Sequence, residues 1–186
     1  MAWIEIINED DATGALKAVY DTITQQRGKM SNIMRIHSLH PAAMQAHMEL
    51  YLKIMFSRSG GLRRADRELI ATVVSATNGC PYCVNHHAEA LRFYWKDEAR
   101  VAQVMEDYRV LDLPEKTRAM LDYAVKLTQA PASVAEADVA AMRQAGFSDR
   151  DILDINLITS YFNFVNRIAE GLGVAYDSDE MSGYTY

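Results

Sequence analysis

Residues 66–91 read DRELIATVVSATNGCPYCVNHHAEAL and hold the clearest helix signals of the chain. The apolar run from Leu69 to Ala76 has helical spacing and stops at Asn78-Gly79, where glycine commonly ends a helix. Pro81 suits the first turn of a second helix, because its missing N–H would have no helical partner there. The stretch therefore predicts two helices joined by a tight turn.

Apolar residues recur with a helical period along most of the chain. Helices are expected around Leu16 to Ile23, after Pro41, and over residues 81–95, 97–107, 115–129, 135–145, 149–159 and 160–172. No run shows the alternation with a period of two that is typical of a strand. We therefore expect an all-α multihelical bundle, with residues 1–175 as one domain and 176–186 as a tail that is frayed or docked on another subunit.

Two segments, about residues 60–95 and 145–175, resemble each other. The first contains Asp66-Arg67-Glu68-Leu69, which aligns with Asp149-Arg150-Asp151-Ile152 in the second. Val84-Asn85 aligns in the same way with Val165-Asn166. The similarity predicts an internal duplication of a helix-turn-helix unit, packed as a pseudo-symmetric bundle.

The second segment lacks the reactive groups of the first. Aligned in this way, three positions of the first segment correspond to large apolar or aromatic residues in the second: Cys80 to Tyr161, Cys83 to Phe164, and His87 to Ile168. We therefore expect these positions to face an interior in both halves, and the first half to carry a reactive site.

Composition narrows the class of protein. A net charge of -6 leaves no basic face to neutralise nucleic-acid phosphates. The N-terminus has no basic region followed by an apolar run, and no stretch is long and apolar enough to span a membrane. A cytoplasmic enzyme that binds neither nucleic acid nor membrane is expected.

The chain has two cysteines, Cys80 and Cys83, spaced as Cys-x-x-Cys. In a reducing compartment such a pair serves redox chemistry or metal binding. A zinc site would need further ligands at suitable spacing, which are missing, so we expect no metal and no cofactor. An inert core role stays open as an alternative.

The spacing places the reactive groups on one helix face. Cys80 would enter the helix at its N-terminus, where the helix dipole favours a thiolate and lowers a cysteine pKa. His87 follows Cys83 by four residues, on the same stripe, and can take its proton. Glu68, at the start of the preceding helix, would orient His87 if the two helices pack antiparallel.

Other polar residues have plainer interpretations. We interpret His37, His40 and His47 as surface or capping histidines. Asn163 and Asn166, beside Arg167, are expected to serve helix packing or an interface.

These residues give the chain a resemblance to the AhpD-like alkylhydroperoxidase family, part of the carboxymuconolactone decarboxylase superfamily, and within it to the peroxidase-related branch. The matching motif is a glutamate, then twelve positions further on a Cys-x-x-Cys-x-x-x-His, which here is Glu68, Cys80, Cys83 and His87. The resemblance covers roughly residues 30–175.

The resemblance implies a function and partners. Cys83, deprotonated through His87 and Glu68, would attack hydrogen peroxide or an organic hydroperoxide, and Cys80 would close a disulfide. A dithiol partner such as a lipoyl domain or a thioredoxin-like protein would reduce that disulfide. The family also implies a homo-oligomer, as a dimer, trimer or hexamer.

One position departs from the family pattern. The best-known members carry a histidine directly before the second cysteine, where this chain has Tyr82. The expected proton relay therefore lacks a second histidine, which affects the expected efficiency of peroxide reduction and the expected reductant. The alternatives are a protein disulfide reductase or redox adaptor, and an oligomeric binding protein with a vestigial redox site.

Overall fold

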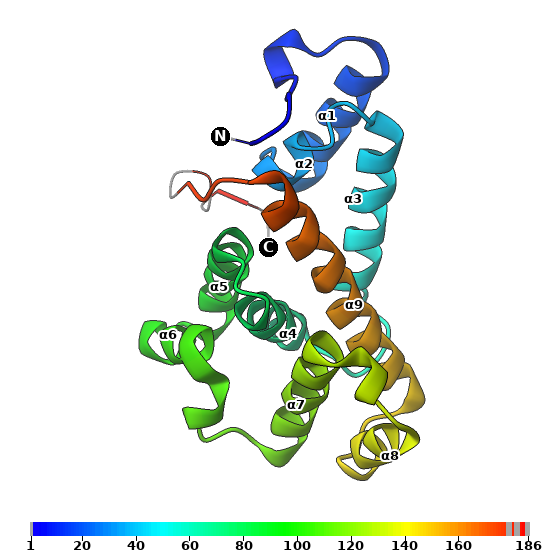
Figure 1. The fold of residues 1–186 in the computed structure, drawn as a ribbon, viewed down its shortest axis with the longest axis vertical. Helices are drawn as coiled ribbons and strands as arrows, with labels where there is room; N and C mark the ends of the chain where they lie inside the picture. The colour runs from blue at the N-terminus through cyan, green and yellow to red at the C-terminus, as the bar shows by residue number, and fades with distance from the viewer. Residues whose placement is uncertain (1, 178–179, 181–182, 185–186) are drawn as a thin grey trace.

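The computed structural model describes residues 2–177, 180 and 183–184 (Figure 1). Within them the chain is helical, without a strand, as predicted. The α-helices are α1 (Gly14–Arg27), α2 (Asn32–Arg35), α3 (Pro41–Met55), α4 (Arg64–Thr77), α5 (Pro81–Trp95), α6 (Glu98–Asp107), α7 (Glu115–Gln129), α8 (Glu136–Gln144) and α9 (Asp149–Leu172). Short 3-10 turns, Glu9–Asp11, Tyr108–Val110 and Pro131–Ser133, lie between them.

Helix α4 lies at the centre of the fold and packs against α5, α7 and α9 (Figure 1). Every residue from Arg67 to Ser75 is buried, which is possible only for a helix covered on nearly all sides. The apolar side chains of this run, including Leu69, Ile70 and Val73, belong to the hydrophobic core. The predicted pair of helices around Asn78-Gly79 is therefore confirmed.

The turn between α4 and α5 depends on its glycine. Gly79 has a φ of 67°, in the left-handed region that side chains disfavour. This conformation lets the Cys80 N–H donate to the Ser75 carbonyl at 3.0 Å. The chain reverses within three residues, and Cys80 becomes the residue that caps the start of α5.

The second copy of the predicted helix-turn-helix unit is not formed. The helices expected over residues 149–159 and 160–172 are one continuous helix, α9. The physical reason is local: no glycine or proline lies between Asp149 and Glu170, whereas Gly79 and Pro81 break the first segment. The two segments thus share a sequence pattern at their helix starts but not a turn.

The three positions aligned with the reactive residues differ in exposure. Tyr161 is buried and Ile168 half-buried, but Phe164 is 50 % exposed, so the expectation that it faces an interior is wrong. Helix α9 packs on α3, α4 and α7, but Phe164 lies at the edge of this contact, where its ring is 5.6 Å from that of His47 and half of its surface stays exposed.

Two described residues near the C-terminus pack against the rest of the chain. Glu180 and Tyr184 are buried, close to α2 and α5, so these two residues are neither frayed nor docked on another subunit. Tyr176, by contrast, is exposed. Residues 178–179, 181–182 and 185–186 of the predicted tail lie outside the described residues.

Asn166 joins α9 to the end of α4. Its amide nitrogen donates to Ser75 Oγ at 3.1 Å, and its oxygen accepts from Asn78 Nδ2 at 2.8 Å. Asn163 accepts from the same Asn78 nitrogen at 3.1 Å. The helix-packing interpretation of these asparagines is confirmed.

Candidate functional site

The two cysteines meet at the start of α5. Cys80 is the N-cap residue, and its sulfur accepts a hydrogen bond from the Cys83 backbone N–H at 3.3 Å. The two sulfur atoms lie 2.6 Å apart, and both residues are almost fully buried. A disulfide between them therefore needs little backbone movement.

The Cys83 thiol is held in its protonated form. The hydrogen-bonded contact with Cys80 raises the pKa of Cys83, and burial raises it further. A hydrogen bond from Asn166 opposes this rise. Because its pKa is raised, Cys83 needs a nearby base to take its proton before it can react as a thiolate.

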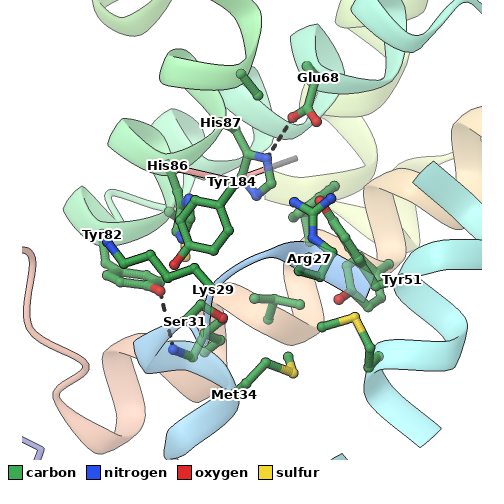
Figure 2. A pocket seen from close by; sticks show the side chains of 17 residues that line it. Arg27, Lys29, Ser31, Met34, Tyr51, Glu68, Tyr82, His86, His87 and Tyr184 are labelled. Atoms are coloured by element: carbon green, nitrogen blue, oxygen red, sulfur yellow. Dashed lines mark hydrogen bonds and ion pairs between the residues drawn. The ribbon is translucent and has the colours of Figure 1, made fainter. Parts of the chain in front are cut away.

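Glu68 and His87 are brought together by the antiparallel packing of α4 and α5, as the sequence predicted. His87 Nδ1 lies 2.7 Å from Glu68 Oε2 (Figure 2). If Nδ1 carries the hydrogen, the carboxylate fixes the ring and leaves Nε2 as an acceptor. Burial lowers the pKa of His87, and Glu68 offsets only part of that effect, so the ring is neutral and able to take a proton at neutral pH.

Arg64 completes this buried group and was missed by the sequence analysis. Its Nη2 lies 2.7 Å from Glu68 Oε1. Burial by itself raises the pKa of Glu68, but the Arg64 and His87 interactions outweigh it, so the pKa lies below its usual value and the carboxylate stays charged. Arg64 precedes Glu68 by four residues on one helix, so this spacing could have revealed it.

A pocket with a cavity of about 60 Å³ opens beside Cys83 (Figure 2). Cys83 lines it and Cys80 does not. Its walls are mostly apolar or aromatic, with the buried Arg27 held against the rings of Tyr51 and Phe56. A cavity of this size suits a small molecule placed against the Cys83 sulfur.

Tyr82 is the residue that departs from the family pattern. It connects the site to Glu180, near the C-terminus. Its hydroxyl donates to Glu180 Oε1 at 3.0 Å and accepts from the Ile33 N–H at 3.2 Å. Tyr184 also donates to Glu180 Oε1, at 2.7 Å, and its ring lies 4.8 Å from that of His86. No pattern in the sequence indicates that Glu180 and Tyr184 reach this site.

The histidine cluster is only partly as predicted. His40 caps α3, because its Nδ1 accepts from the Ala43 N–H at 3.2 Å. His47 is buried, which makes the surface or capping interpretation wrong for that residue. Its Nε2 lies 2.7 Å from Tyr161 Oη, and Tyr161 lines the pocket. The spacing of the histidines did not indicate this partner, because Tyr161 lies 114 residues further along the chain, on another helix.

In the part of the chain that the structure describes, no three histidine, cysteine, aspartate or glutamate side chains are grouped so that they could hold a metal ion. The helices described there are also too short or too polar to cross a membrane.

Comparison with known proteins identifies the family. The model of the carboxymuconolactone decarboxylase family matches residues 41–111, which include Glu68, both cysteines and His87. The crystal structure of a peroxidase-related protein from Ralstonia eutropha JMP134, described as an alkylhydroperoxidase AhpD core, is 30% identical with a TM-score of 0.86 over 97% of this chain and 94% of that chain. A peroxidase-related protein from Silicibacter sp. TM1040 is also 30% identical, with a TM-score of 0.87 and the same coverage.

A curated relative is more distant. The protein YdfG of Bacillus subtilis (strain 168) is 24% identical over 146 residues, which are 77% of this chain and 96% of that protein. Together with the full-length likeness to the two crystal structures, these matches show that the chain belongs to the AhpD-like branch of the carboxymuconolactone decarboxylase family.

Proposed function

We propose that this protein is a thiol-dependent peroxidase that reduces hydrogen peroxide or organic hydroperoxides through Cys83 and Cys80. The observation that supports the proposal is one pocket whose lining includes Cys83 and the hydrogen-bonded His87–Glu68 pair, with the Cys80 sulfur 2.6 Å from that of Cys83. Nucleophile, base, base-orienting carboxylate and resolving thiol are thus supplied within one site.

The proposed cycle begins with a proton transfer from Cys83. His87 takes the proton of Cys83, and the thiolate attacks the terminal oxygen of the hydroperoxide, forming an S–O bond as the O–O bond breaks. The leaving alkoxide takes the proton from His87, which gives an alcohol and a sulfenic acid on Cys83. Cys80 then attacks Cys83, a disulfide forms, and water leaves.

The division of roles between the cysteines rests on access. Cys83 lines the pocket, which favours it as the attacking residue, although its pKa is raised. Cys80 does not line the pocket but lies 2.6 Å from the Cys83 sulfur, which favours it as the resolving residue. The raised pKa makes the base essential and predicts that loss of His87 slows attack strongly.

We propose that a dithiol, such as a lipoyl domain or a thioredoxin-like protein, restores the reduced pair by disulfide exchange. A homo-oligomer is also proposed. Leu153, Leu157 and Phe164 are exposed and share one face of α9, and an apolar stripe of this kind favours contact with a second copy.

Stopped-flow measurement tests the proposed function. We expect Cys83 to react with a hydroperoxide at least about a hundredfold faster than free cysteine reacts with the same hydroperoxide, in keeping with general acid-base catalysis. A sulfenate should form first and the disulfide second. Cys83→Ser should abolish the reaction, and Cys80→Ser should stop it at the sulfenic acid. Reaction no faster than that of free cysteine, together with rapid exchange with a protein disulfide, would instead favour a disulfide reductase.

A further inference from the structure

A row of hydrogen bonds, buried at its Tyr161 end and partly buried at His37, runs from the pocket to the backbone of α2. Tyr161 Oη lies 2.7 Å from His47 Nε2, and His47 Nδ1 lies 3.3 Å from His37 Nε2. His37 Nδ1 lies 2.9 Å from the Ile33 carbonyl oxygen. The proposed cycle uses none of these groups, although Tyr161 shares the pocket with Cys83.

The carbonyl at the far end sets the direction of every bond in the row. A carbonyl oxygen only accepts, so His37 Nδ1 must carry a hydrogen. In neutral His37, Nε2 is then an acceptor, which requires a hydrogen on His47 Nδ1. In neutral His47, Nε2 becomes an acceptor in turn, and Tyr161 must donate its only hydrogen to it.

Both rings are neutral at physiological pH. Burial lowers the pKa of His47 to about 3, and burial likewise lowers the pKa of His37. Burial also raises the pKa of Tyr161 well above its usual value, so its hydroxyl stays protonated. The direction derived from the Ile33 carbonyl therefore holds at physiological pH.

We infer that Tyr161 acts in the pocket only as a hydrogen-bond acceptor and positions the O–H group of a hydroperoxide against Cys83. This inference rests on the proposed function. Its basis is that the Tyr161 hydrogen is committed to His47, so only oxygen lone pairs are left for a molecule in the pocket.

The chemistry of attack gives this acceptor a purpose. In a hydroperoxide, the terminal oxygen carries the hydrogen and is the atom that the thiolate attacks. A hydrogen bond to Tyr161 holds that oxygen in place, and the hydrogen stays on it as it becomes the sulfenic acid hydroxyl. The departing oxygen takes its proton from His87 on the other side. A dialkyl peroxide has no such O–H group, so the site selects hydroperoxides.

Tyr161→Phe tests the acceptor directly. We expect the rate constant for Cys83 oxidation by tert-butyl hydroperoxide to fall roughly 3- to 10-fold, the effect of one lost neutral hydrogen bond. Reaction of Cys83 with 4,4′-dithiodipyridine, which has no O–H group, should stay within about twofold of wild type on the same argument. Tyr123→Phe is the matched control, because it removes a buried tyrosine hydroxyl that accepts from Asn156 at 2.9 Å outside the pocket.

The outcomes separate the two proposals. A wild-type protein that reacts with the hydroperoxide no faster than free cysteine overturns the proposed function and the substrate role of Tyr161 with it. A fast wild type with an equally fast Tyr161→Phe variant overturns the inference alone. An equal fall with both reagents would show a structural effect and also count against it.

Nitrogen-15 NMR of the histidine rings in the wild type provides a second measurement, which does not depend on a variant that folds. We expect both His37 and His47 in the Nδ1–H tautomer, the less common form of free imidazole. If His47 carries its hydrogen on Nε2, Tyr161 accepts from it and becomes a donor to the pocket, and the inference is wrong. If Tyr161→Phe does not fold, His37→Phe is the alternative variant, because it removes the histidine that fixes the hydrogen on His47 Nδ1. It should slow oxidation of Cys83 by the hydroperoxide but not its reaction with 4,4′-dithiodipyridine.

Discussion

His87 and Glu68 come from different helices, and their side chains meet at 2.7 Å only because α4 and α5 pack antiparallel across the Gly79 turn. The carboxylate is almost fully buried and is kept charged by Arg64 as well as by His87. The base of the proposed reaction is therefore oriented by a charge that the fold itself stabilises.

Glu68→Gln should weaken this base. The amide can still accept from His87, but without the negative charge the protonated ring is less stable and the Cys83 thiolate forms less readily. We expect alkylation of Cys83 by iodoacetamide at pH 7 to slow about 10-fold, and the pH midpoint of the reaction to rise by roughly 1 unit. Glu89→Gln is the control, because Glu89 is a more exposed glutamate on α5 that pairs with Arg92. An unshifted midpoint in Glu68→Gln would show that Glu68 does not act through His87.

Arg67→Met should be strongly destabilising. Arg67 is 1% exposed, donates to the Ile54 carbonyl at 2.6 Å, and lies 3.4 Å from Asp154. Methionine keeps most of the volume but leaves the buried Ile54 carbonyl without its donor and leaves Asp154 with Arg150, at 3.0 Å, as its remaining ion pair. The loss of these contacts should cost about 2–3 kcal/mol of unfolding free energy. Arg63→Met, at a mostly exposed ion pair with Asp66, should cost less than about 1 kcal/mol. Urea unfolding curves measure both, and similar losses in the two variants would contradict the prediction.

Two glycine-to-alanine changes should have opposite effects. A Cβ at Gly79 or Gly171 meets no atom within 4 Å, so crowding plays no part at either position. Gly79 has a positive φ, and alanine there should lower the unfolding free energy by about 1–2 kcal/mol. Gly171 lies within α9, where alanine is the better helix former and should raise it by about 0.5 kcal/mol. A thermal melt that moves in the same direction for both variants would refute this account of the turn.

Stability should fall on acidification, in part through His47. Its pKa is near 6.5 when unfolded and about 3 in the folded protein. Between these values the unfolded chain binds more protons, so the unfolding free energy decreases as the pH decreases. From pH 6.5 to pH 5 this single group should cost about 2 kcal/mol. Unfolding measured at both pH values should show a smaller loss in His47→Leu than in wild type, whereas equal losses would mean that His47 is not buried in neutral form.

Local sequence signals gave most of the helices. The bounds of α5 and α7 match the expected ranges 81–95 and 115–129, because Pro81 and Pro114 mark their starts clearly. The predicted break near residue 160 was wrong, because no helix-breaking residue lies there. Apolar periodicity shows where a helix continues, and only glycine, proline or a capping group shows where it ends.

Local sequence patterns were enough to predict most of the helices, the tight turn at Gly79, and the stripe of Cys80, Cys83 and His87. Those features depend on interactions between residues near one another in the chain, so spacing is enough to reveal them. Tertiary structure alone decided that Glu180 reaches Tyr82 and that His47 reaches Tyr161. Each of those pairs joins residues about a hundred positions apart, and their meeting depends on how whole helices pack to bury apolar surface, which no local pattern records.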